Sequence, residues 1–67
     1  MNARITYRYD ETSDQRAWIV DIEDDAGSET LSVHPTEKEA RLEAKRQSAR
    51  RGLDCYRVDM HGVRTSA

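Results

Sequence analysis

Apolar and polar residues alternate along the first half of the chain. Apolar side chains occupy every second position of residues 5–9 and again of residues 18–22, the period of a strand with one buried face. A shorter segment with the same period covers residues 30–34, and residues 24–28 between the last two segments have turn composition. The pattern predicts three strands in sequence, joined by short links as an antiparallel meander.

A helix is predicted to follow the third strand, over residues 37–51. Pro35 prevents the strand from continuing, because it has no backbone N–H and fixes its own φ. Thr36 is suited to cap the helix N-terminus, and Glu39 three residues later completes a capping box. Gly52 tolerates the left-handed conformation in which many helices end. All these local signals agree on the helix and on its two ends.

The predicted helix has an unusual face toward the sheet. Helical spacing places Ala40, Ala44, Gln47, Ser48 and Arg51 on one side, and three of these residues are small. Small side chains let a helix approach a sheet closely. We therefore expect the Trp and Tyr side chains of the strands to fill most of the space between the two layers.

After the helix, residues 55–60 alternate again and predict a fourth strand. Residues 61–62 would turn the chain, and residues 63–67 are expected to fray. The predicted fold is α+β: a two-layer sandwich of a three-stranded antiparallel meander, one helix and one further strand, in the order βββαβ. Sixty-seven residues make one small domain, residues 1–67, with an ordered core of about residues 3–62.

Composition adds that the core is small and the charge unevenly distributed. The chain is 36% hydrophobic and 36% charged, so its stability is expected to be marginal and self-association would bury more apolar surface. The net charge of −2 is the sum of two unequal parts: residues 10–29 carry a net charge of −7, and the remaining residues carry +5. No apolar run suggests a signal peptide or membrane span, and Cys55 is the only cysteine. A cytoplasmic protein is expected.

Catalysis and metal binding are weakly indicated. The only candidate pair of a nucleophile and a base is Cys55 with His34 or His61. Because the spacing of these residues is unspecific, we expect no enzymatic activity. A calcium loop starting at Asp21 fails, because its sixth position is not Gly and its twelfth is Ser32 rather than Glu. The histidines lack partners at zinc spacing. No cofactor and no metal are predicted.

Two charged segments are the candidate binding residues. The predicted helix carries basic residues that would contact phosphates or a partner: Lys38, Arg41, Lys45, Arg46, Arg50 and Arg51. On the polar strand faces, Arg4, Arg8 and Arg57 would extend this patch. The predicted hairpin between the second and third strands carries acidic residues that would face a partner: Glu23, Asp24, Asp25 and Glu29. The alternative is that both segments are only solvated, with interleaved glutamates neutralising part of the helix charge.

Short motifs give the chain a resemblance to known families. They are an early W-x-V strand, a T-x-x-E-A helix start, alanines within the helix, a helix-ending glycine and a final strand closing on glycine. In this sequence they are Trp18-Ile19-Val20, Thr36-Glu37-Lys38-Glu39-Ala40, Ala44 and Ala49, Gly52, and His61-Gly62. Over about residues 17–64 the chain resembles a family of short bacterial and phage proteins known only as a domain of unknown function. That resemblance implies a fold and almost nothing about activity.

Two better understood groups share parts of this pattern. HicB-type antitoxins are similar from the Trp18 strand to the end of the helix, which implies a toxin partner. They differ by a Pro-Asp-Leu/Pro-Gly segment where this chain has acidic residues 23–25. The arm-type DNA-binding domains of tyrosine-recombinase integrases also resemble it through three strands and the same helix start, but their sheets are generally basic.

The sequence therefore favours a non-enzymatic module that binds another protein or forms a homodimer, through the sheet edge and the charged faces. The alternative is an accessory domain that binds nucleic acid with the basic helix. An antitoxin-like partner of a small toxin is a more distant alternative. No membrane association is expected.

Overall fold

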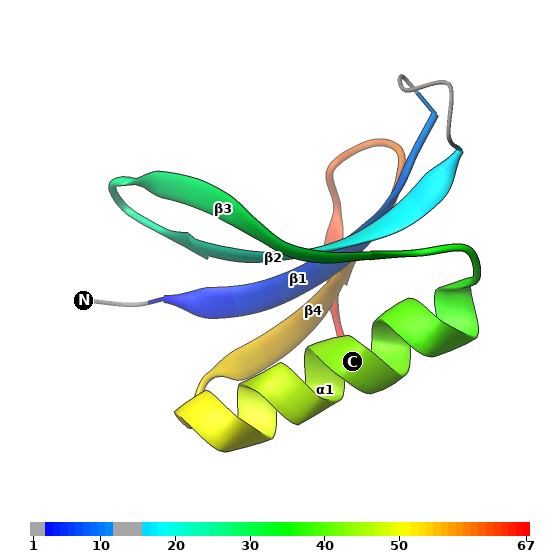
Figure 1. Cartoon of the computed structure of the whole chain (residues 1–67). Coiled ribbons are helices and arrows are strands. Elements are labelled where there is room, and N and C mark those ends of the chain that lie inside the picture. The colour runs from blue at the N-terminus through cyan, green and yellow to red at the C-terminus, as the bar shows by residue number, and fades with distance from the viewer. Residues whose placement is uncertain (1–2, 12–15) are drawn as a thin grey trace.

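A computed structural model describes residues 3–11 and 16–67 of the chain. One helix packs on one side of a twisted five-stranded sheet (Figure 1). The elements are β1 (Arg4–Asp10), β2 (Ala17–Asp24), β3 (Gly27–His34), α1 (Glu37–Arg51), β4 (Asp54–Val58) and β5 (Arg64–Ser66). The strands are arranged in the order β3-β2-β1-β4-β5, so β1 is central and β3 and β5 are the edges.

The predicted α+β class and the order of three strands, a helix and a strand are confirmed, but the sheet is mixed rather than antiparallel. β1, β2 and β3 form the antiparallel meander, whereas β4 pairs parallel to β1. The reason lies in the connection: α1 carries the chain from the end of β3 back across the sheet, and β4 then runs in the direction of β1 and β3. Parallel neighbours require such a long crossover.

Strand β5 lies in the segment that was expected to fray, so that expectation is wrong for Arg64–Ser66. A tight turn precedes this strand. The side chain of Asp59 accepts hydrogen bonds from the backbone N–H groups of Val63 and His61, at 2.9 and 2.8 Å, and these bonds, the Val63 bond foremost, lower the pKa of the carboxyl. Gly62 supplies the positive φ of 80° that the turn requires. Pairing with β4 then aligns the strand.

Helix α1 has the bounds that its capping residues predict. The hydroxyl of Thr36 accepts a hydrogen bond from the backbone N–H of Glu39 at 3.2 Å. At the other end Gly52 has φ of 66°, and the backbone N–H of Leu53 donates to the carbonyl of Ser48 at 3.0 Å. Both helix ends are therefore fixed by local contacts.

The core forms where the small face of α1 meets the sheet. Ala40 and Ala44 are fully buried, as the sequence predicts, against Ile5, Tyr7 and Val20. Trp18 packs beside this cluster but is only partly buried, so of the aromatic side chains expected between the two layers only Tyr7 lies within the buried core. The predicted face is also narrower than expected, because Arg51 is exposed.

The opposite face of the sheet carries no helix among the described residues. Register places Arg4, Thr6 and Arg8 on this uncovered face, since their neighbours in β1 point toward α1. Tyr56 and Val58 of β4 pair with these positions and so share the uncovered face. Cys55, rather than the larger apolar residues of β4, points into the core.

A larger side chain at the helix–sheet contact is expected to destabilise the fold. Ala44→Leu should lower the free energy of unfolding by about 1–3 kcal/mol, because the added atoms have no space beneath the helix. The matched control is Ala49→Leu on the same helix, which is exposed and should change stability by less than about 0.5 kcal/mol. Thermal and denaturant unfolding followed by circular dichroism measures both. Equal effects at the two positions would contradict the close packing.

Candidate functional site

The predicted basic residues are all exposed on α1, but they do not form one surface. They are Lys38, Arg41, Lys45, Arg46, Arg50 and Arg51. Burial raises the pKa of the Cys55 thiol, and the positive charges of Lys45 and Arg41 oppose that shift. These two cations therefore lie on the side of the helix toward β4. Helical spacing places Arg46 and Arg50 on the other side.

Two flanks of α1 can be distinguished by their contacts. Glu37 accepts a hydrogen bond from Arg57, and the hydroxyl of Ser48 donates one to the carbonyl of Leu53. Both contacts lie on the side of the helix toward β4. Because a helix turns by about 100° per residue, the residues on its opposite side face β3. On that opposite side Arg46 approaches Glu43 at 3.4 Å. The β4 flank consists of Glu37, Arg41, Lys45 and Ser48, and the β3 flank of Glu39, Glu43, Arg46 and Arg50.

The acidic hairpin is only partly available to a partner. Glu23 is bound within the chain, at 2.6 Å from Arg4 and 2.6 Å from Arg64. Asp24 accepts a hydrogen bond from the backbone N–H of Ala26 at 2.8 Å and so shapes the turn. The other two predicted residues, Asp25 and Glu29, are exposed.

The hairpin also lies beside the basic end of the helix in the same chain. Asp24, Glu29 and Arg51 line a hollow of about 490 Å³ between the hairpin and the helix C-terminus. Opposite charges that are far apart in the sequence are thus neighbours within one molecule. The uneven charge of the sequence does not by itself require a second chain.

The arginines on the strands do not extend the helix patch. Arg4 and Arg8 lie on the uncovered face, where Arg4 pairs with Glu23 and Arg8 approaches Asp21 at 3.4 Å. Asp21 is only 7% exposed, and its second carboxylate oxygen has no hydrogen-bond partner among the described residues. The uncovered face is therefore occupied by ion pairs within the chain, which leave little charge for an outside ligand.

Arg57 belongs to the face that carries α1, at the end where the aromatic rings gather. Its Nε donates to Glu37 at 2.9 Å, and its guanidinium lies 5.6 Å from the centre of the Trp18 ring. Tyr9, which pairs with Trp18 across β1 and β2, lies with its ring centre 5.4 Å from that of Trp18. Sequence reasoning missed this cluster, because only the strand register brings the three side chains together.

A hollow of about 700 Å³ opens beside this aromatic cluster, where β1 and β4 end. Its apolar wall includes Trp18, Tyr9 and Met60. Its charged residues have both signs: Arg8 and Arg57 are basic, and Asp10, Glu11 and Asp59 are acidic. This balance selects neither an anionic nor a cationic ligand.

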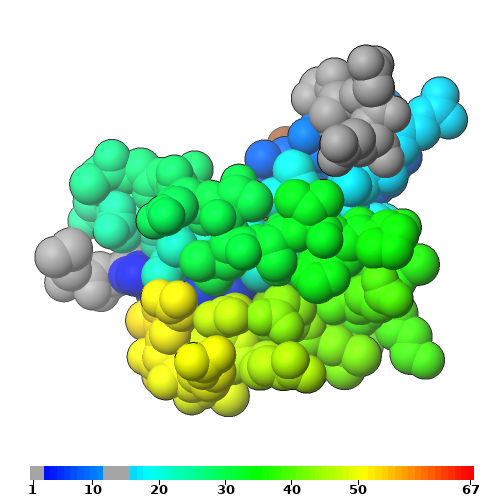
Figure 2. Space-filling model, viewed as in Figure 1, coloured from blue at the N-terminus to red at the C-terminus, as the bar shows by residue number. Residues whose placement is uncertain are grey.

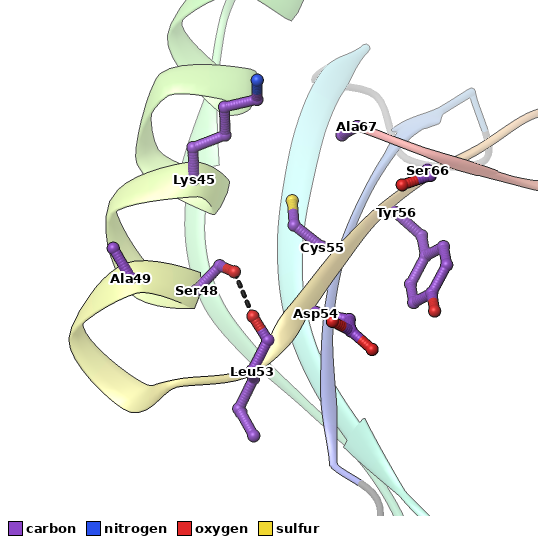
Figure 3. Close-up of a pocket in the computed structure, with 9 residues that line it drawn as sticks. All are labelled: Lys45, Ser48, Ala49, Leu53, Asp54, Cys55, Tyr56, Ser66 and Ala67. Atoms are coloured by element: carbon purple, nitrogen blue, oxygen red, sulfur yellow. Dashed lines mark hydrogen bonds between the residues drawn. The ribbon is translucent and has the colours of Figure 1, made fainter.

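A second groove separates the β4 flank from β4 and β5 (Figure 3). The Cys55 thiol points toward the helix, and Lys45 extends along the opposite wall. Neither histidine is placed to act as a base for this thiol: His34 lies on β3, with two strands between it and β4, and His61 lies beyond the far end of β4. With a volume of about 470 Å³ and a protonated thiol, the groove has space but no activated nucleophile.

The free edge of β3 is the longest unpaired stretch of backbone in the described sheet. β3 pairs on one side with β2 and has no strand on its other side, over eight residues, whereas β5 at the other edge has three. In the space-filling view β3 spans the visible face of the molecule, with α1 directly below it (Figure 2). The strand contains neither Lys nor Pro, the residues that commonly protect such edges.

Comparisons of the chain with models of protein families, with curated proteins and with solved structures find no match. The family resemblance therefore stays a prediction. Within the described residues, no group of three or more His, Cys, Asp or Glu side chains is placed to hold a metal ion. No described helix is both long and apolar enough to cross a membrane.

The Cys55 thiol is expected to react slowly and only at high pH. Burial raises its pKa, so the rate of alkylation by iodoacetamide should reach half its maximum above the value near pH 8.5 of an ordinary thiol. Lys45→Met should move this midpoint higher still, because it removes the charge that opposes the pKa shift most strongly. Arg46→Met on the β3 flank is the control and should leave the midpoint unchanged. A midpoint below that of a model thiol would show that Cys55 is activated.

Proposed function

We propose that this protein is a small non-enzymatic interaction module that binds an extended protein segment along the free edge of β3. One observation carries the proposal: eight residues of strand lie open on one side, next to an exposed helix flank. A strand added to such an edge gains main-chain hydrogen bonds, and its side chains gain contacts on the faces of the sheet.

Apolar side chains are available for these contacts. Val33 is 51% exposed at the edge, and register places it beside Ile19 on the uncovered face. An incoming strand that alternates apolar and polar residues would cover this pair. The short β5 offers fewer backbone groups and is a weaker template.

The surroundings of Cys55 support a non-enzymatic role, since its thiol is protonated and separated from both histidines. A free cysteine with no disulfide partner suits the cytoplasm, which we propose as the compartment. The resemblance to HicB-type antitoxins makes a small toxin an alternative partner of the same class.

Lysine at the β3 edge is expected to weaken the binding of extended peptides. A displayed library of random peptides should yield ligands for the full chain. Their dissociation constants should rise at least tenfold for Val33→Lys, because a charge at the edge opposes strand pairing. Leu42→Lys is the matched control: Leu42 is 59% exposed on the outer side of α1 and should not matter. Ligands indifferent to Val33→Lys would refute the β3 site.

A second candidate function is nucleic-acid binding by the helix. Lys38, Arg41, Lys45 and Arg50 are exposed, and none forms an ion pair with a described residue. The first three follow each other along the outer side and the β4 flank, so one phosphate backbone would reach them together. The candidate ranks second because the strand arginines are already paired.

Salt dependence tests this second candidate. Three phosphate contacts to a mixed-sequence DNA duplex would weaken binding about 40-fold between 50 and 200 mM salt. Reversing Arg41 and Lys45 to Glu should remove that dependence, whereas reversing Arg46 and Arg50 on the β3 flank should reduce it less. Fluorescence anisotropy measures both. The absence of salt-sensitive binding at 50 mM would eliminate the nucleic-acid function.

A further inference from the structure

We infer that the partner at the β3 edge is a second copy of this chain, joined by a two-fold axis that makes β3 pair antiparallel with β3 of the other copy. The inference rests on the proposed function, since it uses the same edge. It follows from two observations: the matched extents of β3 and α1, and the order of charges on the β3 flank.

Strand β3 and helix α1 extend over the same length of the molecule. Two residues separate the end of β3 from the start of the helix, and at the other end of the helix Arg51 lines a hollow together with Gly27 and Leu31 of β3. The middle of the helix therefore lies beside the middle of the strand. A single two-fold axis can pass close to both, and it would place the two helices antiparallel on the same face of one continuous sheet.

The β3 flank of α1 is self-complementary under such an axis. Along the helix its charges are negative at Glu39 and Glu43, then positive at Arg46 and Arg50. In an antiparallel arrangement the acidic half of one copy faces the basic half of the other. A parallel arrangement would oppose like charges, so the order of charges selects the two-fold.

Of the four charges on the β3 flank, the two nearest the helix ends are available for ion pairs between copies. Glu39 and Arg50 are exposed and make no ion pair with a described residue, whereas Glu43 and Arg46 already approach one another. Glu39 of each copy would face Arg50 of the other, giving two equivalent pairs in each dimer. The charged flank fixes orientation, and strand pairing supplies most of the affinity.

A bulge in β3 is compatible with this axis. Val20 of β2 pairs with Ser32, but the next residue, Asp21, pairs with Thr30, so Leu31 is the extra residue and packs toward the core. Two shorter segments remain, residues 27–30 and 32–34. With the axis at Ser32, Thr30 of one copy would lie opposite Val33 of the other and Glu29 opposite His34, so that paired side chains share one face of the sheet.

Oligomeric state and charge reversal test the inference. Sedimentation equilibrium of the full chain should show a monomer–dimer equilibrium. Glu39→Arg alone and Arg50→Glu alone should each weaken dimerisation about tenfold, because each opposes like charges twice in a dimer. An equimolar mixture of the two variants should associate about as tightly as the original chain, since both pairs are then complementary.

The chain carrying both reversals is the decisive control. Each change puts an unfavourable charge at a helix end, so a purely structural effect would make the double variant the worst of all. The two-fold instead predicts that its dimer forms as well as the original. Failure of the double variant and of the mixture to recover, although both fold by circular dichroism, would overturn the inference.

The proposed function can survive the loss of this inference. A chain that stays monomeric up to about 1 mM, the limit of weak association, would refute the homodimer. If library peptides still bound it in a Val33-dependent manner, the β3 edge would serve a different protein. If Val33→Lys changed neither peptide binding nor dimerisation, both proposals would fall.

Discussion

The close contact of Ala40 and Ala44 with the sheet is the constraint on which the structure depends. Both residues are fully buried, and no other residue of α1 is. Because the helix offers so little apolar volume, the strands must supply it, and Ile5 and Val20 are the largest side chains that are fully buried. A larger residue on the helix would lift it from the sheet, whereas a smaller one on the strands would leave a cavity that α1 cannot fill.

This contact also decides which edge of the sheet stays open. The helix crosses from the end of β3 to the start of β4, and so places β4 beside β1 on the side away from β3. The second half of the chain therefore covers the outer edge of β1 and leaves the edge of β3 free. The turn at Asp59 then adds β5 to the same side. Both strands that follow α1, β4 and β5, are therefore added to the side of the sheet opposite β3.

Local signals predicted what local interactions determine. Thr36 and Gly52 set the ends of α1, and alternation located the first three strands, because each of these signals acts within a few residues. The direction of β4 was not predictable in this way, since alternation is the same in parallel and antiparallel strands. The candidate basic residues were correctly expected on the helix, but their division into two flanks depends on where Ala40 and Ala44 lie. The ion pairs of Glu23 required the full register.

The distribution of charge then distinguishes the edge from the faces. On the uncovered face Arg4, Arg8 and Arg64 form ion pairs with acids of β2, so these charges need no partner from outside the chain. Side-chain ion pairs cannot satisfy the outward backbone groups of β3, which need either water or another strand. Because the core is small, we expect pairing with another strand to be more favourable than hydration by water. The added strand would extend the apolar surface of the sheet, of which one helix covers only a part. The edge is thus the part of the molecule where a partner contributes most to stability.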